Sequence, residues 1–397
     1  MANVLFLTHR MPYPPDKGDK IIGFNFLRHL AAGHSVFLGA FVDNAADREH
    51  VDKVKSLCAD VKLIDIQPLP RRLWSSRALL RGESLSEVYY RSIALQRWID
   101  EVVPRHQISV ALAYCSAMAP YLDGNRFAAL RRVAHYADVD SEKWKSFAAK
   151  HHGVMRWIYG REARTLLKLE HRMSRVFDVT SFVSDADAAL YKQLAPDVAE
   201  KVRVIPIGVD TDYFDPNLPR VNPFPSASRS IVFTGAMDYW PNVDAVSWFA
   251  TQVLGRIRHS VPNAQFWIVG SNPTRAVNEL RAIPGVNVTG RVPDVRPYIA
   301  HAAAVVAPLR VARGVQSKVL EAYAMARRVV LTGASANGLI QSSLVSEAAY
   351  DEPEQLCIAV CQAMDAEPRF DAARKYVLDN YSWSHTFSLL DEALELN

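Results

Sequence analysis

The chain has few cysteines and no long hydrophobic run, and these absences exclude several classes of protein. No segment approaches the roughly 18 uninterrupted apolar residues of a membrane-spanning helix, and the amino terminus lacks the charged and apolar regions of a secretory signal. The 397 residues include four cysteines without Cys-x-x-Cys spacing, which argues against a zinc site or a redox pair. We therefore expect a soluble, cytoplasmic protein with reduced thiols at Cys58, Cys115, Cys357 and Cys361.

Glycine-rich dinucleotide motifs and internal repeats are also missing. No Gly-x-Gly-x-x-Gly follows a hydrophobic run, which disfavours a dinucleotide oxidoreductase. What the chain does have is 49% hydrophobic residues, enough to build two domains of about 150 to 200 residues each. Residues 1–210 contain 30 Lys and Arg against 24 Asp and Glu, whereas the remainder contains 16 against 18. The basic first half indicates contact with an acidic surface, substrate or membrane.

Apolar runs alternate with helical periodicities along the chain. This alternation predicts an α/β fold in which helices cover both faces of parallel sheets. The segment DPNLPRVNPFPSASRS, residues 215–230, is rich in Pro, Asn and Ser and is predicted to be a linker. Ligands of such sheets bind beyond the carboxyl ends of the strands. The predicted strands are residues 4–7, 36–41, 61–66, 108–113, 132–135, 179–183, 231–233, 266–269 and 305–307.

The segment RGVQSKVLEAYAMARRVV, residues 313–330, contains the most informative pattern. Gly314 follows an apolar strand and is expected to open a helix, whose unpaired N–H groups and dipole favour a diphosphate. Lys318 adds charge, and Glu321 lies one turn further on the same face, where a carboxylate can accept hydrogen bonds from ribose hydroxyls. The alternative interpretation is a loop-to-helix transition with one solvated salt pair.

This segment resembles the donor-site signature of glycosyltransferase family 4, retaining enzymes with the GT-B fold. Glu321 matches the second glutamate of that signature, and Arg313 stands where many members have the first. Further resemblance lies in SFVSDADAALYK, VIPIGVDTDYF and IVFTGAMDYWPNVDAVSWF. The opening HRMPYPPDKGDK and the TGAMDYWPN block are most similar to the sugar transferases of exosortase/PEP-CTERM exopolysaccharide clusters.

The resemblance implies two Rossmann-like domains whose parallel sheets face each other across an interdomain cleft. Residues 1–205 would form the acceptor domain and residues 206–377 the nucleotide-sugar donor domain. A closing helix, residues 378–397 and containing Tyr381-Ser382-Trp383, would pack back on the first domain.

The resemblance also assigns the candidate site residues. The expected donor-binding residues are Gly235, Arg291, Arg313, Gly314, Val315, Gln316, Lys318 and Glu321. The expected loop around the acceptor and the donor phosphates follows the first strand and contains His9, Arg10, Lys17 and Asp19; its alternative interpretation is a surface turn set by Pro14-Pro15. The catalytic candidates are Gly18, His135, Asp138 and Asp140, although a lone histidine at a strand end is more often packed than catalytic.

No metal and no cofactor is expected. A carboxylate pair can hold a divalent cation on a diphosphate, but we interpret the Asp-x-Asp pairs here as coincidental, because Lys318, a helix start and Arg291 or Arg313 can neutralise the diphosphate. The three pairs are Asp138/Asp140, Asp185/Asp187 and Asp210/Asp212.

The favoured function is transfer of a sugar from a nucleotide-sugar donor to a glycan or lipid-linked acceptor. The alternatives are a GT-B-like nucleotide-sugar 2-epimerase and a non-catalytic sugar-binding scaffold. No nucleic acid partner is expected. The basic aromatic segments RRLWSSRALLR, residues 71–81, and RWIYGREARTLLKLEHR, residues 156–172, fit either peripheral contact with an anionic inner membrane or ordinary helices on a sheet.

Overall fold

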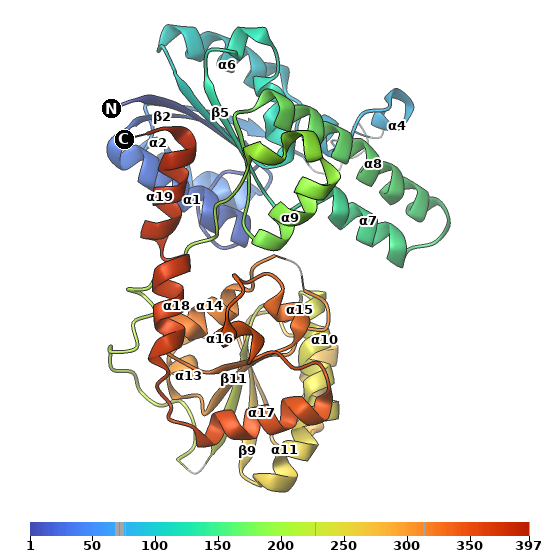
Figure 1. The fold of residues 1–397 in the computed structure, drawn as a ribbon, viewed down its shortest axis with the longest axis vertical. Helices are drawn as coiled ribbons and strands as arrows, with labels where there is room; N and C mark the ends of the chain where they lie inside the picture. Colours follow the sequence, from blue (N-terminus) through green and yellow to red (C-terminus); the bar gives the residue numbers. More distant parts are fainter. Residues whose placement is uncertain (68–70, 72–74, 76, 227, 313, 397) are drawn as a thin grey trace. The chain divides into compact units, whose positions relative to one another are not determined.

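The chain folds into two compact units, shown in a computed structural model (Figure 1). The structure describes residues 1–67, 71, 75, 77–226, 228–312 and 314–396, with the backbone alone at residues 80 and 81. The first unit contains Met1–Val183, Asp187–Ile205 and Phe387–Asn397, and the second contains Ser184–Ala186 and Pro206–Thr386. The predicted division at 205/206 lies at the point where the chain passes from Ile205 to Pro206.

The first unit is built on a parallel sheet of seven strands in the order β3-β2-β1-β4-β5-β6-β7. Strands such as β4 are buried at every residue, because helices cover both faces of a parallel sheet and leave no side for water. The strands are β1 Asn3–Thr8, β2 Ser35–Val42, β3 Asp60–Asp65, β4 Val110–Tyr114, β5 Arg131–Ala137, β6 Val179–Phe182 and β7 Val202–Val204. The helices are α1 Gly18–Gly33, α2 Val51–Lys55, α4 Ala78–Arg81, α5 Leu85–Tyr89, α6 Ile93–Arg105, α7 Asp140–Lys150, α8 Gly153–Val176 and α9 Asp185–Leu194.

The second unit is built on a parallel sheet of five strands in the order β10-β9-β8-β11-β12. Its strands are β8 Arg229–Thr234, β9 Ala264–Val269, β10 Val286–Gly290, β11 Ala304–Ala307 and β12 Val329–Leu331. Its helices are α10 Trp240–Trp248, α11 Leu254–Ser260, α12 Arg275–Glu279, α13 Arg296–His301, α14 Ser317–Ala324, α15 Gly333–Ala336, α16 Ser343–Ser346, α17 Pro353–Asp365 and α18 Asp371–Tyr381. A π-helical turn, Phe249–Val253, joins α10 to α11.

The predicted α/β class with two parallel sheets is confirmed, and each of the nine predicted strands overlaps a strand of the structure. Three strands of the structure were not predicted from the sequence: β7, β10 and β12. Two of them, β7 and β12, have only three residues, which is too short for a periodicity to separate them from neighbouring helical patterns.

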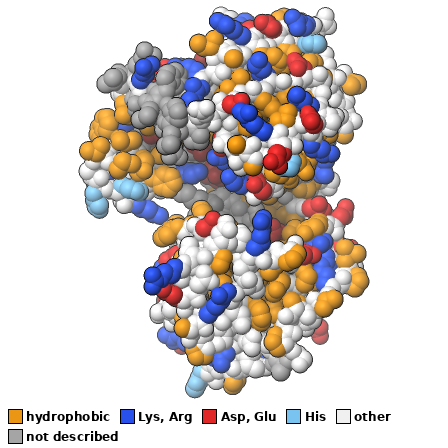
Figure 2. Space-filling view, turned by 180° about the vertical axis from the view of Figure 1, so that it is seen from behind, with side chains coloured by type: hydrophobic (Ala, Val, Ile, Leu, Met, Phe, Trp, Pro, Cys, Tyr) orange, Lys and Arg blue, Asp and Glu red, His pale blue; other side chains and the backbone are white. Residues whose placement is uncertain are grey.

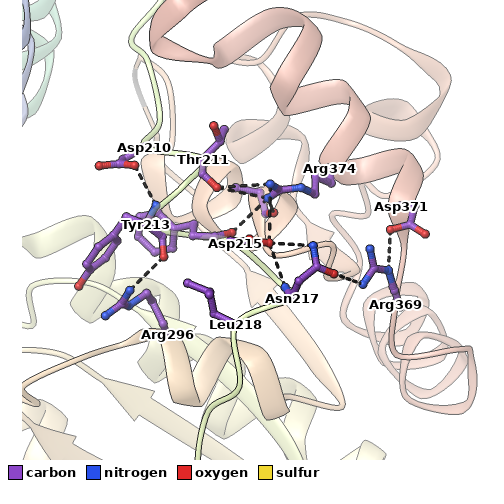
Figure 3. A network of polar contacts seen from close by, with 12 residues as sticks. Asp210, Thr211, Tyr213, Asp215, Asn217, Leu218, Arg296, Arg369, Asp371 and Arg374 are labelled. Carbon is purple, nitrogen blue, oxygen red and sulfur yellow. Dashed lines mark hydrogen bonds and ion pairs between the residues drawn. The ribbon is translucent and has the colours of Figure 1, made fainter.

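The start of the predicted linker, residues 215–230, is held by side chains from later in the chain: Arg369 donates to the Asn217 Oδ1 at 2.9 Å, and Arg374 lies 3.8 Å from the Asp215 carboxylate. Residues 210–220 are bound to the second unit by arginine side chains of α13 and α18 (Figure 3). Arg374 donates to the carbonyl oxygens of Thr211, Phe214 and Ala324, and Arg296 donates to the Tyr213 carbonyl while its guanidinium lies 3.6 Å from the centre of the Tyr213 ring. The Pro, Asn and Ser content predicted irregular backbone here. It could not predict the hydrogen bonds from Arg296 and Arg374, because those residues are far away in the sequence.

The closing segment forms two helices rather than one. Ser382 is extended, with φ −68° and ψ 147°, and separates α18 from α19, Trp383–Leu394. It bridges to Val209, and the Trp383 ring occupies the place where a side chain of Gly208 would stand, since a Cβ there would lie 2.3 Å from the ring. In the first unit, Phe387 stacks on His29 with 4.1 Å between ring centres.

Candidate functional site

Glycines end the central strands of the second sheet and bring their carboxyl ends into close contact. Gly235 follows β8 and Gly270 follows β9. A Cβ on Gly270 would lie 1.6 Å from the Gly235 carbonyl oxygen, so no other residue fits there without moving the loop. The Gly235 amide donates to the Val269 carbonyl at 3.1 Å. These contacts hold the loop after β8 against the end of β9.

The loop between β11 and α14 is packed equally closely. Gly314 adopts a left-handed φ of +61°, which favours glycine. A Cβ on Gly338 would lie 2.0 Å from the Gly314 carbonyl oxygen. The expectation that Gly314 opens the helix is therefore wrong: α14 begins at Ser317 after the N-cap Gln316, because a residue with positive φ cannot continue a right-handed helix.

Lys318 and Glu321 lie one turn apart on the same face of α14, and both residues are half-buried. The Lys318 Nζ lies 5.3 Å from the centre of the Phe233 ring and 3.4 Å from the Gln316 Oε1. Burial lowers the pKa of Lys318 to about 8 and raises the pKa of Glu321 to about 7. Each group partly offsets the cost of burying the other, since the charge of each favours ionisation of its neighbour.

The Glu321 carboxylate has unused acceptor capacity. Among the residues that the structure describes, none donates a hydrogen bond to it; its electrostatic neighbour is Lys318. An ionised carboxylate has about four lone-pair sites that can accept hydrogen bonds. The arrangement can therefore receive hydroxyl donors from a ligand, with an ammonium one turn away for an anionic group.

The other predicted donor residues are placed as follows. Val315 and Gln316 lie in the loop before α14. Gly235 follows β8, the strand next to β11 in the sheet. Arg291 is exposed after β10, and β9 and β8 lie between β10 and β11. At about 4.8 Å for each strand, the end of β10 is therefore on the order of 14 Å from the end of β11. Arg313 lies outside the described residues.

In the first unit, the residues after β1 form an ion-pair cluster. Arg10 bonds Asp19 and Asp43 at 2.8 Å each, and the His9 Nε2 lies 3.2 Å from the Asp19 Oδ2. Burial opposes ionisation of Asp19, but the hydrogen bond from His9 and the charges of His9 and Arg10 hold its pKa well below its ordinary value. The predicted loop residues His9, Arg10 and Asp19 therefore come together at the end of β1.

Two further loop residues stand at the start of α1. Lys17 is the N-cap of the helix and uses no side-chain cap, and Gly18 is its first residue. A Cβ on Gly18 would meet no atom within 4 Å, so the space above it is open in this unit. Lys20, by contrast, is buried and bonds Asp47 at 2.7 Å, which makes it part of the packing.

The catalytic candidates after β5 separate into two groups. His135 is fully buried, its Nδ1 lies 2.9 Å from the Ser181 Oγ, and its ring contacts Phe26 and Tyr114. Burial lowers the pKa of His135 to about 3, so the ring is neutral. The ring is packed on both sides, and among the described residues its Nε2 has no hydrogen-bond partner.

Asp138 and Asp140, in contrast, are half-buried beyond the strand end. Asp140 begins α7 and accepts a hydrogen bond from the Ser116 Oγ at 3.2 Å, and burial raises its pKa. His9 also acts on it electrostatically. Because β1, β4 and β5 are neighbours, the structure brings His9, Ser116 and Asp140 to one edge of the sheet. Ser116 was not predicted, although it follows the buried strand β4.

The three Asp-x-Asp pairs lie in different surroundings: the first follows β5, the second begins α9, and Asp210 of the third accepts from the Tyr213 amide. Within the described ranges, no three His, Cys, Asp or Glu side chains form a group that could hold a metal ion.

Comparisons with known proteins agree with this geometry. Residues 228–366 match the family model described as "Glycosyl transferases group 1". No curated protein sequence matches the chain. Among solved structures, a sucrose-phosphate synthase from Thermosynechococcus elongatus has a TM-score of 0.67 at 14% identity, and a glycosyltransferase from Rickettsia africae has 0.63 at 15%; each alignment covers 100% of this chain and 99% of the other.

Another similar structure is Anabaena Alr3699/HepE in complex with UDP and glucose, with a TM-score of 0.61 at 14% identity over 100% of both chains. These likenesses establish the two-domain GT-B fold. The family match places α14, with Lys318 and Glu321, inside the matched segment.

Proposed function

We propose that this glycosyltransferase, whose second unit carries the group 1 domain, transfers a sugar from a nucleoside diphosphate donor to a glycan or lipid-linked acceptor with retention of configuration. The observation that carries the proposal is the half-buried Lys318 and Glu321 pair with its unused acceptor capacity. The complex of Anabaena HepE with UDP and glucose supports the same class of donor. The finer assignment, to exopolysaccharide biosynthesis in exosortase/PEP-CTERM clusters, rests on the HRMPYPPDKGDK and TGAMDYWPN segments.

Lys318 and Glu321 would divide the donor between them. Breaking the anomeric C–O bond leaves negative charge on the diphosphate, which a preorganised cation and unpaired helix N–H groups stabilise. The start of α14 has no side-chain cap and Lys318 is in its first turn. Glu321, one turn further along, would accept the ribose hydroxyls. Val315, Gln316 and Gly235 would contact the donor through their backbone.

The acceptor would be held by the polar edge of the first unit. Asp140 and His9 are the groups at this edge that can accept or pass a proton. Asp138, Lys17 and Gly18 lie near the same strand ends, and the space above Gly18 is open for a ligand. We infer that His135 acts through packing, because its ring is covered by Phe26 and Tyr114. Arg10 would keep Asp19 ionised and His9 oriented.

The test is a donor-depletion screen over nucleotide-sugars, with membrane extract as acceptor. A transferase consumes the donor only when the acceptor is present and passes its sugar to a larger product. Conversion of the donor alone to an epimer would establish the 2-epimerase instead. A scaffold would consume no donor under either condition, and its role in cells would survive Glu321→Gln.

The pH dependence of nucleoside diphosphate binding should be bell-shaped. Glu321 accepts hydroxyls best when ionised, and its pKa is raised to about 7, so affinity should fall as the pH drops below that value. Lys318 attracts the diphosphate only when protonated, and its pKa is lowered to about 8, so affinity should also fall above pH 8. Calorimetric titration with UDP, GDP and ADP across pH measures both limbs. The acidic limb should flatten in Glu321→Gln, and an unaltered acidic limb in that variant would assign it to the phosphates of the nucleotide.

Chelator should leave activity intact. Lys318 and the uncapped start of α14 supply positive charge to the diphosphate without a divalent cation. Initial rates with and without excess EDTA make the comparison. Loss of activity that magnesium or manganese restores would contradict the proposal and return attention to the Asp-x-Asp pairs.

A lipid-linked acceptor would place the enzyme at an anionic inner membrane as a peripheral protein. Within the described part of the chain, no helix is long and apolar enough to cross a bilayer. Of the two basic segments considered for membrane contact, residues 71–81 lie partly outside the described residues. Arg71 donates to the backbone carbonyls of Tyr89 and Arg91, so its guanidinium serves packing rather than a membrane.

A further inference from the structure

The helical hairpin of α7 and α8 ends in an exposed apolar tip. We define the hairpin tip as residues 143–160. Every residue from Ala149 to Trp157 is exposed, and the apolar side chains among the tip residues include Phe147 at 39%, Val154 at 72%, Met155 at 41% and Trp157 at 55% exposure. In Figure 1, α7 and α8 project from the first unit as an arm. So many large apolar side chains on one projection are unusual for a surface that faces only water.

The hairpin tip is internally packed, so these side chains are presented on a rigid support. Trp144 contacts Phe147 and Tyr159 with ring centres 5.8 Å and 5.5 Å apart, and His151 meets Tyr159 at 4.9 Å. The His151 Nδ1 also lies 2.8 Å from the Phe147 carbonyl oxygen. The aromatic cluster joins the two helices across their connection.

The stem of the hairpin is anchored in the first unit. Outside the hairpin, Ser84, Leu85 and Ser86 donate to the Glu162 carboxylate of α8. Within it, Glu170 of α8 accepts hydrogen bonds from the amide and hydroxyl of Ser141 of α7. Leu166 and Leu169 are buried. One face of the predicted interfacial segment, residues 156–172, is thus committed to packing, whereas Arg164, Lys168 and Arg172 on α8 are exposed.

The charges of the hairpin tip are of one sign. No acidic residue occurs between Glu142 and Glu162, whereas five cationic residues do. One of them, Arg161, is buried and donates to the carbonyls of Ala78 and Glu83. The other four are exposed: Lys143, Lys145, Lys150 and Arg156, of which Lys145 forms an ion pair with Glu142 at 2.9 Å. Figure 2 shows hydrophobic side chains gathered on this arm with histidine and cationic side chains beside them.

We propose that the hairpin tip docks the protein on an anionic membrane, with the Trp157, Val154 and Met155 side chains entering the interfacial region and the surrounding cations meeting lipid phosphates. Trp and Tyr with Lys and Arg, without acidic residues, match an interface that is apolar below and negative above. The proposal extends the proposed function by placing the transferase where a lipid-linked acceptor lies, and its test is independent of the donor.

The experiment is vesicle flotation of the full chain with phosphatidylcholine alone or mixed with phosphatidylglycerol, at low and moderate salt. The wild type should float only with the anionic vesicles, and less at higher salt, because the attraction is screened within a Debye length. Replacing Lys143, Lys150 and Arg156 by Gln should lower the partition coefficient about 100-fold, at about fivefold for each charge. Trp157→Ser with Val154→Ser should lower it by at least about tenfold.

Matched variants separate the hairpin tip from bulk properties. Lys53→Gln, Lys55→Gln and Arg105→Gln remove the same charge from other exposed positions of the first unit, and Ile93→Ser removes an apolar side chain that is 71% exposed. These variants should float as the wild type does. Calorimetric UDP binding by the tip variants, whose changes lie outside the second unit, should be unchanged and reports on the donor site separately.

Absence of flotation by the wild type, or equal loss in tip and matched variants, would overturn the proposal. A wild type that elutes as a dimer, does not float, and becomes monomeric with Trp157→Ser would show that a second copy covers the hairpin tip. Either result would contradict membrane docking but would be compatible with sugar transfer to a water-soluble acceptor. A wild type that floats with anionic vesicles but transfers no sugar would contradict the proposed function and leave membrane docking supported.

Discussion

Glu321→Gln should weaken nucleoside diphosphate binding by about 1 to 3 kcal/mol, because a charge-assisted hydrogen bond to the ribose becomes a neutral one. The side chains have the same shape, so packing around α14 is preserved. The measurement is calorimetry with UDP, GDP and ADP at pH 8, where the raised pKa of Glu321, about 7, leaves it ionised.

The same change should not destabilise the second unit. A carboxyl whose pKa is raised on folding opposes folding at pH values above its ordinary pKa, so replacing it by an amide removes that opposition. The melting temperature of Glu321→Gln at pH 8 should therefore equal or exceed that of the wild type. Glu279→Gln, at an exposed residue paired with Arg275 on α12, is the matched control for both measurements. Unchanged nucleotide affinity in Glu321→Gln would remove Glu321 from the donor site.

Gly338→Ala should damage the loop that precedes α14. The added methyl group would lie 2.0 Å from the Gly314 carbonyl oxygen and 3.1 Å from the Val315 amide nitrogen. Both are backbone atoms that cannot rotate away, so residues 314–316 must move. We expect the free energy of unfolding to fall by about 1 to 3 kcal/mol, as for other overpacked sites. The free energy of nucleotide binding should weaken by more than the free energy of unfolding does. Chemical denaturation and calorimetric titration measure the two effects.

Gly255→Ala is the control for this substitution. Gly255 lies in α11 of the same unit, and a Cβ there would meet no atom within 4 Å. Alanine should be neutral or stabilising by up to about 1 kcal/mol, since glycine is unfavourable inside a helix. Wild-type nucleotide affinity in Gly338→Ala would show that the contact between Gly338 and Gly314 does not shape the donor site.

Part of the site was readable because its residues are close in sequence. Lys318 and Glu321 are three residues apart in an amphipathic helix, and that spacing alone puts them on one face. The same local logic identified the residues after β1. It did not decide between a packed and a catalytic role for His135, because one residue of register decides whether a side chain at a strand end points into the core or toward a ligand, and the neighbouring rings of Phe26 and Tyr114 come from other elements.

The sequence by itself determined the α/β class, the parallel sheets and the helix that bears Lys318 and Glu321, because hydrophobic periodicity and helical spacing are local properties. Tertiary structure alone decided that Gly270 and Gly338 must lack side chains, that the arginines of α13 and α18 hold residues 210–220, and that the apolar residues of the hairpin tip are exposed in the described part of the chain. Each of these depends on which atoms of distant segments meet in space. Hydrophobic periodicity reports on neighbouring residues of one segment, so it does not predict which distant segments come into contact or which surfaces stay exposed.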